Sequence, residues 1–278
     1  MRIAVLSGKG GTGKTFVSVN LACVSGSAVY IDCDVEEPNG RLFLRPKHTS
    51  KTEVSVLLPK FDETKCSSCR ECVRFCKFNA LAFIKNKPFV FKDVCHSCGG
   101  CKLMCRSNAV TEIETPIGSI ETGIHDNIKV VTGELNIGEA SGVPVIRQAL
   151  RMGFAYGNKI TIIDCPPGSA CSVTESITTA DYCLLVTEPT AFGLYNLGMV
   201  ANLVKIIKKP CGVVVNKHDG MYPALEEFCK ENALPILARI PYTKETAHTI
   251  SEGKIVVEEN KELYLLFCNL LAQIGGIP

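Results

Sequence analysis

The sequence predicts an α/β fold in which a mainly parallel sheet is flanked by helices and carries a small α+β insert. Apolar strands at residues 2–6, 28–31 and 159–163 each lead into a polar loop, and a helical pattern follows the first, as is typical of parallel sheets. Eight cysteines between Cys66 and Cys105 predict the insert. We expect a frame at residues 1–59 and 112–278, with the insert at residues 60–111.

Composition limits the functions that the chain can have. It has 278 residues, a hydrophobic fraction of 46% and a net charge of +2. The low charge argues against nucleic acid as a partner, and no apolar run approaches the roughly 18 residues that span a bilayer. Sixteen cysteines without an export signal predict a reducing, cytoplasmic setting and no membrane partner.

A phosphate-binding loop follows the first strand. Residues 7–15 read SGKGGTGKT and lead into a helix that ends near Gly26. Backbone N–H groups of such a glycine-rich loop close around phosphate oxygens at the start of a helix. Lys14 is expected to reach the β- and γ-phosphates, and the Thr15 hydroxyl to bind Mg²⁺. The predicted nucleotide-binding residues of the loop are Gly8, Gly10, Gly11, Thr12, Gly13, Lys14, Thr15 and Phe16.

Two aspartate-bearing segments follow further strands of the frame. Residues 32–39 read DCDVEEPN after the strand at 28–31, and Asp164 followed by CPPGS ends the strand at 159–163. Four apolar or β-branched residues before an aspartate make the second segment a Walker B strand, whose carboxylate holds Mg²⁺ through water. Segments 181–189 and 211–217 read as two more buried parallel strands.

The eight clustered cysteines form two runs, each with the spacing C-x2-C-x2-C-x3-C. Three thiolates at steps of three residues fit a loop around one face of a 4Fe-4S cubane, and in two-cluster ferredoxins the fourth cysteine of each run serves the other cluster. One predicted cluster has the ligands Cys66, Cys69, Cys72 and Cys105. The other has Cys95, Cys98, Cys101 and Cys76.

Zinc binding and disulfide bonding account for these cysteines less well. Zinc sites use paired C-x2-C knuckles with a longer gap, and disulfides require an oxidising compartment. Lys77 and Arg106 stand where ferredoxin runs usually carry proline, which changes the turn but not the ligands. Most of the remaining cysteines are expected to fill apolar core positions; they are Cys23, Cys33, Cys165, Cys171, Cys183, Cys211, Cys229 and Cys268.

Local patterns around the insert predict its connection to the frame. Residues 47–60 read as an extended approach, and 79–83 and 88–91 as short strands beside the cysteine runs. Residues 109–115 and 119–124 read as a hairpin around Pro116, Ile117 and Gly118, before a frame strand at 127–135. The last helix has an apolar stripe that we expect to be core, with Gly275 as its end.

The loop K-G-G-T-G-K-T, with Lys9 ahead of the glycines, resembles the deviant P-loop of the MinD/ParA/nitrogenase-iron-protein group of ATPases. The resemblance covers the whole chain and implies a P-loop NTPase fold. It implies that Lys9 reaches the phosphates of a partner in a nucleotide-sandwich dimer. Asp34 would orient the attacking water, Asp32 would lie near Mg²⁺, and the Gly168 N–H would sense the γ-phosphate.

The same resemblance implies further contacts. Asn216 and Pro241 match segments that contact adenine, although an asparagine after a strand is commonly a turn former. Cys171 lies seven residues after Asp164, the offset of a cluster ligand in the nitrogenase iron protein. It would then hold a metal or cluster at the dimer axis. The alternative is a buried or incidental thiol, and residues 133–142 lack the second cysteine that the nitrogenase protein carries.

The pattern as a whole is similar to MinD-like ATPases with an inserted two-cluster ferredoxin domain, and more distantly to Mrp-type iron–sulfur carriers. It implies a Mg²⁺-dependent ATPase, a homodimer or a heterodimer with a paralogue, that couples ATP and ADP states to two 4Fe-4S clusters. The first expected use is assembly or carriage of clusters for a client metalloprotein. Alternatives are an electron donor to a redox partner and a MinD-like positioning ATPase with structural clusters, which the weakly basic last helix argues against.

Overall fold

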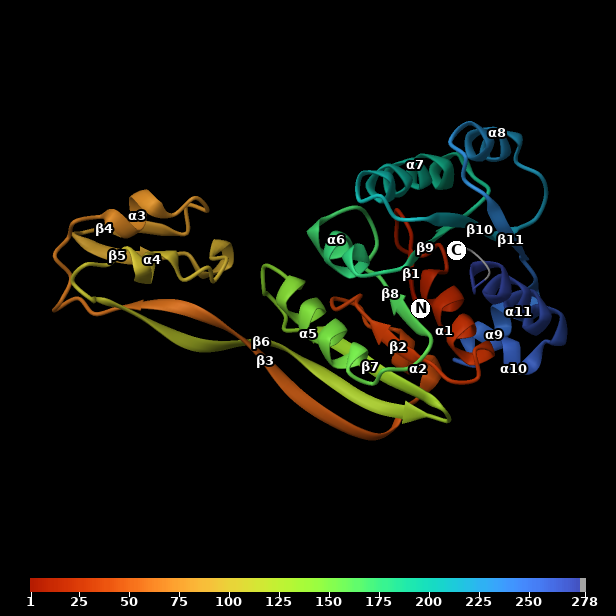
Figure 1. Ribbon diagram of the computed structural model, residues 1–278, viewed down its shortest axis with the longest axis horizontal. Coiled ribbons are helices and arrows are strands. Elements are labelled where there is room, and N and C mark those ends of the chain that lie inside the picture. The colour runs from red at the N-terminus through yellow and green to blue at the C-terminus, as the bar shows by residue number, and fades with distance from the viewer. Residues whose placement is uncertain (276–278) are drawn as a thin grey trace.

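A nine-stranded sheet forms the centre of the computed structural model, which describes residues 1–275 (Figure 1). The strand order is β11-β10-β9-β1-β8-β2-β7-β6-β3, and every pairing from β11 to β7 is parallel. The parallel strands are β1 (Arg2–Leu6), β2 (Val29–Asp32), β7 (Ile128–Leu135), β8 (Thr161–Asp164), β9 (Tyr182–Thr187), β10 (Cys211–His218) and β11 (Ile236–Pro241). The predicted parallel α/β frame is confirmed.

Helices cover both faces of the sheet because its strands are apolar on both sides. In β1, Ala4 and Leu6 pack toward one helical layer, whereas Ile3 and Val5 pack toward the other. The first layer contains α5 (Val143–Phe154), α6 (Cys171–Thr178), α7 (Ala191–Ile206) and α8 (Pro223–Glu231). The second contains α1 (Lys14–Val24), α2 (Gly40–Leu44), α10 (Val256–Glu259) and α11 (Lys261–Gly275), and α9 (Lys244–Ser251) precedes α10.

The last helix, α11, belongs to the core, as its apolar stripe predicts. Leu263, Phe267, Leu270 and Ile274 are buried against the second layer. The helix includes Gly275, the predicted end. No helix within residues 1–275 is both long and apolar enough to cross a membrane.

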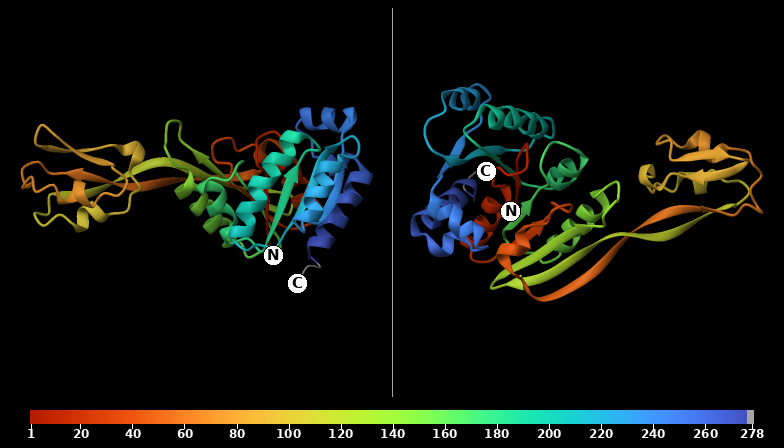
Figure 2. Two further views of the ribbon diagram at one scale, coloured as in Figure 1. Left: turned by 90° about the horizontal axis from the view of Figure 1, so that it is seen from above. Right: turned by 180° about the vertical axis from the view of Figure 1, so that it is seen from behind.

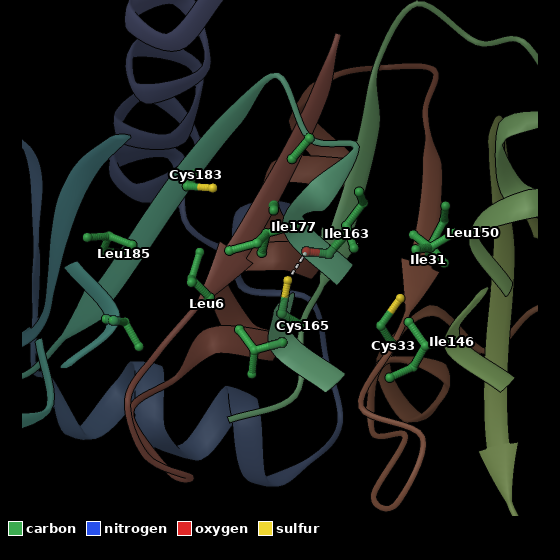
Figure 3. Close-up of a cluster of buried hydrophobic side chains, with 14 of the residues drawn as sticks. Leu6, Ile31, Cys33, Ile146, Leu150, Ile163, Cys165, Ile177, Cys183 and Leu185 are labelled. Atoms are coloured by element: carbon green, nitrogen blue, oxygen red, sulfur yellow. Dashed lines mark hydrogen bonds between the residues drawn. The ribbon is translucent and has the colours of Figure 1, made fainter. Parts of the chain in front are cut away.

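Several cysteines outside the two runs are core residues. Cys33, Cys165 and Cys183 are fully buried among aliphatic side chains of the first layer (Figure 3). The Cys165 thiol also donates a hydrogen bond to the carbonyl of Ile163 at 3.7 Å. Together with the buried Cys229, these thiols confirm the expectation that scattered cysteines act here as small hydrophobic residues.

A long antiparallel ribbon leaves the sheet at its β3 edge. β3 (Lys47–Phe61) pairs with β6 (Val110–His125) along almost its whole length. β7 pairs only with residues 118–125 of β6. The remainder of the two strands therefore projects from the frame, and it carries a small lobe well away from the main body (Figures 1 and 2).

The predicted hairpin around residues 116–118 is wrong, because β6 runs through this segment without turning. The register shifts there, with Val54 opposite Gly118 and Ser55 opposite Pro116. Ile117 is thus the extra residue of a bulge, and a bulge tolerates the neighbouring Pro116, which has no N–H. The reversal comes later, at Asp126 and Asn127 between β6 and β7.

Residues 62–109 form the lobe at the end of the ribbon, hereafter the cysteine lobe. It contains α3 (Glu71–Phe75), β4 (Leu81–Ile84), β5 (Lys87–Val90), a 3-10 turn (Lys92–Val94) and α4 (Gly100–Leu103). A hydrogen bond from the Asp62 N–H to the Ala109 carbonyl, 2.8 Å long, closes its base. The strands predicted at 79–83 and 88–91 correspond to β4 and β5, shifted by one or two residues.

The cysteine lobe is internally duplicated in conformation as well as in sequence. Three pairs of residues at matching places in the two runs share a left-handed backbone, with positive φ: Ser68 and Ser97, Arg70 and Gly99, and Asn79 and Asn108. A local left-handed residue redirects consecutive N–H groups into a concavity that suits anions, including iron–sulfur clusters.

Candidate functional site

The main cavity lies at the carboxyl ends of β1, β8 and β2, which are neighbours in the sheet. Its volume is about 830 Å³. Parallel α/β sheets bind ligands at this edge. Among the predicted residues, those lining it are Lys9, Gly10, Gly11, Gly13, Lys14, Thr15, Phe16 and Asp34. Gly8, Thr12, Asp32, Asp164, Gly168, Asn216 and Pro241 are not part of the lining.

Gly13 ends the loop and caps α1 in a conformation that requires glycine. Its φ is 93°, in the left-handed region that disfavours side chains. A Cβ at this position would also lie 2.1 Å from the Asn216 side-chain nitrogen. That nitrogen donates a hydrogen bond of 2.8 Å to the Thr12 carbonyl. Asn216, which was predicted to contact adenine, therefore stabilises the conformation of the phosphate-binding loop in this structure.

Lys14 joins the two predicted catalytic aspartates. Its Nζ atom lies 3.2 Å from Oδ2 of Asp34 and 3.3 Å from Oδ1 of Asp164. Burial alone would lower the pKa of the Lys14 ammonium, but the carboxylates of Asp164 and Asp34 outweigh burial and raise it. Burial raises the pKa of Asp34, although the charge of Lys14 opposes this effect.

Asp32 and Asp164 lie opposite each other at the ends of β2 and β8. Both are fully buried. The backbone N–H groups of Asp34 and Gly40 donate to the Asp32 carboxylate at 3.1 and 3.0 Å. Burial and the neighbouring Asp164 nevertheless raise the pKa of Asp32 well above its ordinary value. Two adjacent buried carboxylates are a donor set that favours a divalent cation.

Tyr30 is a site residue that sequence reasoning missed. Its hydroxyl donates a 2.9 Å hydrogen bond to Oδ2 of Asp164, and the side chain is fully buried. A Cβ on Gly40 would come within 2.0 Å of this hydroxyl, so glycine is required there. Tyr30 lies within the strand predicted at residues 28–31, but a strand pattern contains no signal for a side-chain partner on another strand.

Lys9 points toward its own protomer in this structure. Its Nζ lies 2.8 Å from Oε2 of Glu188 and 4.8 Å from the centre of the Phe192 ring. Lys217 donates to the other oxygen of Glu188 at 2.6 Å and to the Gly11 carbonyl at 2.9 Å. Glu188 and Lys217 were also missed by sequence reasoning, because both are remote from the loop along the chain: Glu188 directly follows β9 and Lys217 lies on β10.

Three more predicted residues lie outside the cavity lining. The Gly168 N–H, expected to sense a γ-phosphate, donates to the Ser7 carbonyl at 2.9 Å. Pro241 ends β11 opposite His218 and is exposed. Cys171 is exposed at the first position of α6, between the cavity-lining residues Ala170 and Ser172.

The cysteine lobe contains two separate cavities. One, of about 20 Å³, is lined by Cys66, Cys69, Cys72 and Cys105. The other, of about 200 Å³, is lined by Cys76, Cys95, Cys98 and Cys101. Each cavity thus gathers three cysteines of one run and the last cysteine of the other run, the same crossed grouping that the spacing predicts.

The two cavities differ in their surroundings. The Ala109 N–H donates to the Cys105 sulfur at 3.2 Å beside the smaller cavity. His96 stacks on Phe78, with ring centres 3.8 Å apart, and both line the larger cavity. Hydrogen bonds and polar groups near sulfur tune the potential of any cluster held there.

The frame matches a known family along most of its length. The model described as "CbiA: CobQ/CobB/MinD/ParA nucleotide binding domain" matches residues 3–257. Two relatives are uncharacterized proteins of Methanocaldococcus jannaschii. One is 28% identical over 270 residues, covering 94% of this chain and 93% of the relative. The other is 31% identical over 268 residues, covering 95% of each.

Solved structures of MinD proteins share the fold. The cell division ATPase MinD of Pyrococcus furiosus aligns with a TM-score of 0.60 at 19% identity, covering 99% of this chain and 98% of that one. The septum site-determining protein MinD of Pyrococcus horikoshii, complexed with Mg-ADP, gives 0.61 at 16% identity, covering 99% and 96%. The family match over residues 3–257 shows that the chain belongs to the CobQ/CobB/MinD/ParA family of nucleotide-binding proteins.

Proposed function

We propose that this chain is a Mg²⁺-dependent ATPase that dimerises on ATP and couples its nucleotide state to two 4Fe-4S clusters in the cysteine lobe. The first use that we propose is assembly or carriage of iron–sulfur or metal cofactors for a client protein. The observation that carries this proposal is the pair of lobe cavities, each lined by one crossed cysteine quartet. The two runs therefore interleave in space, as a crossed set of cluster ligands requires.

In neither quartet do the cysteine sulfurs form the compact group that a single zinc ion needs. A zinc ion holds four sulfurs at about 2.3 Å, which places them about 3.8 Å from one another. Within residues 1–275, no three cysteines of either quartet have their sulfurs all within 4.8 Å. A cubane does not require this closeness, because its ligands bind different iron atoms. Bound clusters would supply one-electron redox chemistry or act as cargo.

The nucleotide site has the donors that a Mg²⁺–ATP complex requires. We assign the phosphates to the loop at residues 8–15, and Mg²⁺ to the Thr15 hydroxyl and, through water, to Asp164. Asp34 lines the cavity beside Lys14, a position from which its carboxylate can orient the attacking water. We keep Asp32 near Mg²⁺, Gly168 as the γ-phosphate sensor, and Asn216 and Pro241 as adenine contacts in the proposal.

A short path connects the proposed nucleotide site to the cysteine lobe. The Gly40 N–H that donates to Asp32 is at the first residue of α2, and β3 begins only three residues after α2 ends. β3 then runs without interruption to the lobe. A change in the 32–39 segment on binding ATP would therefore act directly on the start of β3. This path favours coupling over a purely structural role for the clusters.

Iron and sulfide analysis tests the cluster part of the proposal. Anaerobically purified protein should contain about eight iron and eight sulfide per protomer. Cys69→Ser and Cys98→Ser should each reduce iron to about half, because each removes a ligand of a different cluster. Cys268→Ser, on α11, is the matched control and should keep the wild-type content. Zinc in place of iron, or equal iron in all variants, would refute the clusters.

Measurements with ATP test the remaining part and separate the uses. Light scattering should give a dimer with ATP and a monomer with ADP, and Lys9→Ala should remain a monomer. Transfer of iron to an apo-ferredoxin would support carriage, whereas retained clusters that reduce an acceptor only with ATP would identify an electron donor. The MinD neighbours favour one rival, a positioning ATPase, for which ATPase activity would be stimulated by lipid vesicles or a positioning partner.

A further inference from the structure

Three side chains of types that can bind metals lie close together near the end of α1 that is remote from the phosphate-binding loop. This group is also far along β6 from the cysteine lobe. Its members are Cys23 near the end of α1, His125 at the end of β6, and Glu258 in α10. One ligand atom from each lies within 4.8 Å of the other two. The imidazole Nε2 of His125 lies 3.9 Å from a carboxylate oxygen of Glu258. Within residues 1–275, no other three histidine, cysteine or acidic side chains have their ligand atoms this close together.

Backbone contacts hold these three side chains in place. The Asn20 side chain, one helical turn before Cys23, accepts a hydrogen bond of 3.0 Å from the Val257 N–H. This bond joins α1 to α10 immediately beside Glu258. His125 precedes a two-residue turn, in which Asp126 has a φ of 47°, and it pairs with Ile128 across that turn. The geometry is therefore set by the fold and not by one flexible surface pair.

We propose that Cys23, His125 and Glu258 bind a zinc ion. Thiolate, imidazole and carboxylate are the three ligand types that zinc takes in proteins, and three protein ligands leave one position open for water. Their separations suit a single ion at about 2.0–2.3 Å from each ligand. The exposed fractions of the His125 and Glu258 side chains are 21% and 54%, so the open position faces solvent. Harder cations such as Mg²⁺ are disfavoured by the sulfur ligand.

The site lies between α1 and β6, two elements that the proposed ATPase cycle would move. α1 begins at Lys14 in the phosphate-binding loop and carries Cys23 near its other end. β6 begins at the cysteine lobe and ends at His125. A zinc ion would join the end of β6 to the end of α1 that lies away from the phosphate-binding loop, so that movement of one element is transmitted to the other. This role rests on the proposed function, but zinc binding itself does not.

Zinc counting on the full chain tests the site. The protein is first loaded anaerobically with iron and sulfide, titrated with ZnCl₂, and passed through a gel-filtration column. Zinc and iron are then measured on the same sample by mass spectrometry. Wild type should retain about one zinc per protomer, the capacity of one mononuclear site. Cys23→Ser and His125→Gln should lose it, with affinity for zinc lowered at least roughly tenfold in competition with a chelator.

Matched controls exclude general effects. Cys268→Ser removes another half-buried helical thiol, and His248→Gln removes a histidine that faces Glu252 at 3.5 Å. Both should retain the zinc. Glu258→Gln is a second test should Cys23→Ser fold poorly, because Glu258 is exposed. Anomalous scattering at the zinc absorption edge should place the ion between the three side chains.

The outcomes separate this inference from the proposed function. Equal zinc in wild type, Cys23→Ser and His125→Gln, or no zinc in wild type, would overturn the site whatever the iron content. Failure of iron to bind would overturn the clusters. The comparison of zinc content between wild type and His125→Gln would still be valid, since this substitution changes none of the eight lobe cysteines. Loss of zinc without any change in iron is the expected pattern.

Discussion

The Nζ atom of Lys9 lies 2.8 Å from the Oε2 atom of Glu188 in the same protomer. Glu188 is nearly buried and also accepts a hydrogen bond from Lys217. Burial alone would raise the pKa of Glu188, but hydrogen bonds from Lys217 and Lys9 outweigh burial and lower it. The carboxylate is therefore charged at neutral pH. A lysine that is to reach a partner subunit must first leave this ion pair.

Glu188→Gln should strengthen ATP-dependent dimerisation. Loss of the carboxylate charge frees Lys9 while leaving an acceptor for Lys217, so the dimer dissociation constant should fall about three- to tenfold, equivalent to roughly 1 kcal/mol. Sedimentation with and without ATP measures it. Glu226→Gln, which removes a surface partner of Arg239, should leave dimerisation unchanged. An unaltered dissociation constant in Glu188→Gln would show that the pair does not restrain Lys9.

Tyr30→Phe should destabilise the protein by about 1–3 kcal/mol, because it leaves a buried oxygen of Asp164 without its donor. Urea unfolding monitored by circular dichroism gives the difference. Tyr182→Phe is the matched control: it is also a buried tyrosine on a central strand, and its hydroxyl has no hydrogen-bond partner within the described residues. That variant should be neutral or slightly stabilised. Equal losses in the two variants would contradict the role given to the hydroxyl.

Gly13→Ala should abolish nucleotide binding. The left-handed φ costs about 1–2 kcal/mol with a side chain, and the new Cβ would displace the Asn216 amide that supports the loop. Fluorescent ATP-analogue binding measures the effect. Gly220→Ala adds a Cβ where no atom lies within 4 Å and should bind normally. Wild-type affinity in Gly13→Ala would mean that the loop does not hold the phosphates.

The stability of nucleotide-free protein should depend on pH through Asp34. Its folded-state pKa is raised, chiefly by burial, above the ordinary value of 3.8. Between the unfolded and folded pKa values, Asp34 keeps a proton in the folded state that the unfolded chain has released, so protonation of Asp34 stabilises the folded state. This stabilisation is complete below the unfolded pKa and is lost as pH rises through the folded pKa. Asp34→Asn removes this dependence.

Urea unfolding at several pH values, from about pH 4 upward, tests this expectation. Relative to Asp34→Asn, wild type should become less stable as the pH rises. Asp34→Asn should also bind ATP but hydrolyse it at a greatly reduced rate, because the proposed water-orienting carboxylate is absent. A stability difference that stays constant over this pH range would show that burial does not dominate the pKa of Asp34.

Local patterns were sufficient for much of the frame. The strand, glycine-rich loop and helix at residues 2–24 follow from neighbours in sequence, and so do the aspartates at the ends of β2 and β8. Residues 116–118 show where such reasoning fails. Proline and glycine there are compatible with both a turn and a bulge, and only pairing with Val54 and Ser55 selects the bulge.

Patterns along the chain were enough to predict the parallel α/β frame, the phosphate-binding loop and the crossed grouping of the duplicated cysteine runs, because each is signalled by residues close together in sequence. Only the assembled fold shows that Lys9 meets Glu188 and that Tyr30 meets Asp164. These contacts join residues far apart in sequence. Their formation depends on strand order and register, which backbone hydrogen bonds between distant segments establish only when the whole sheet assembles.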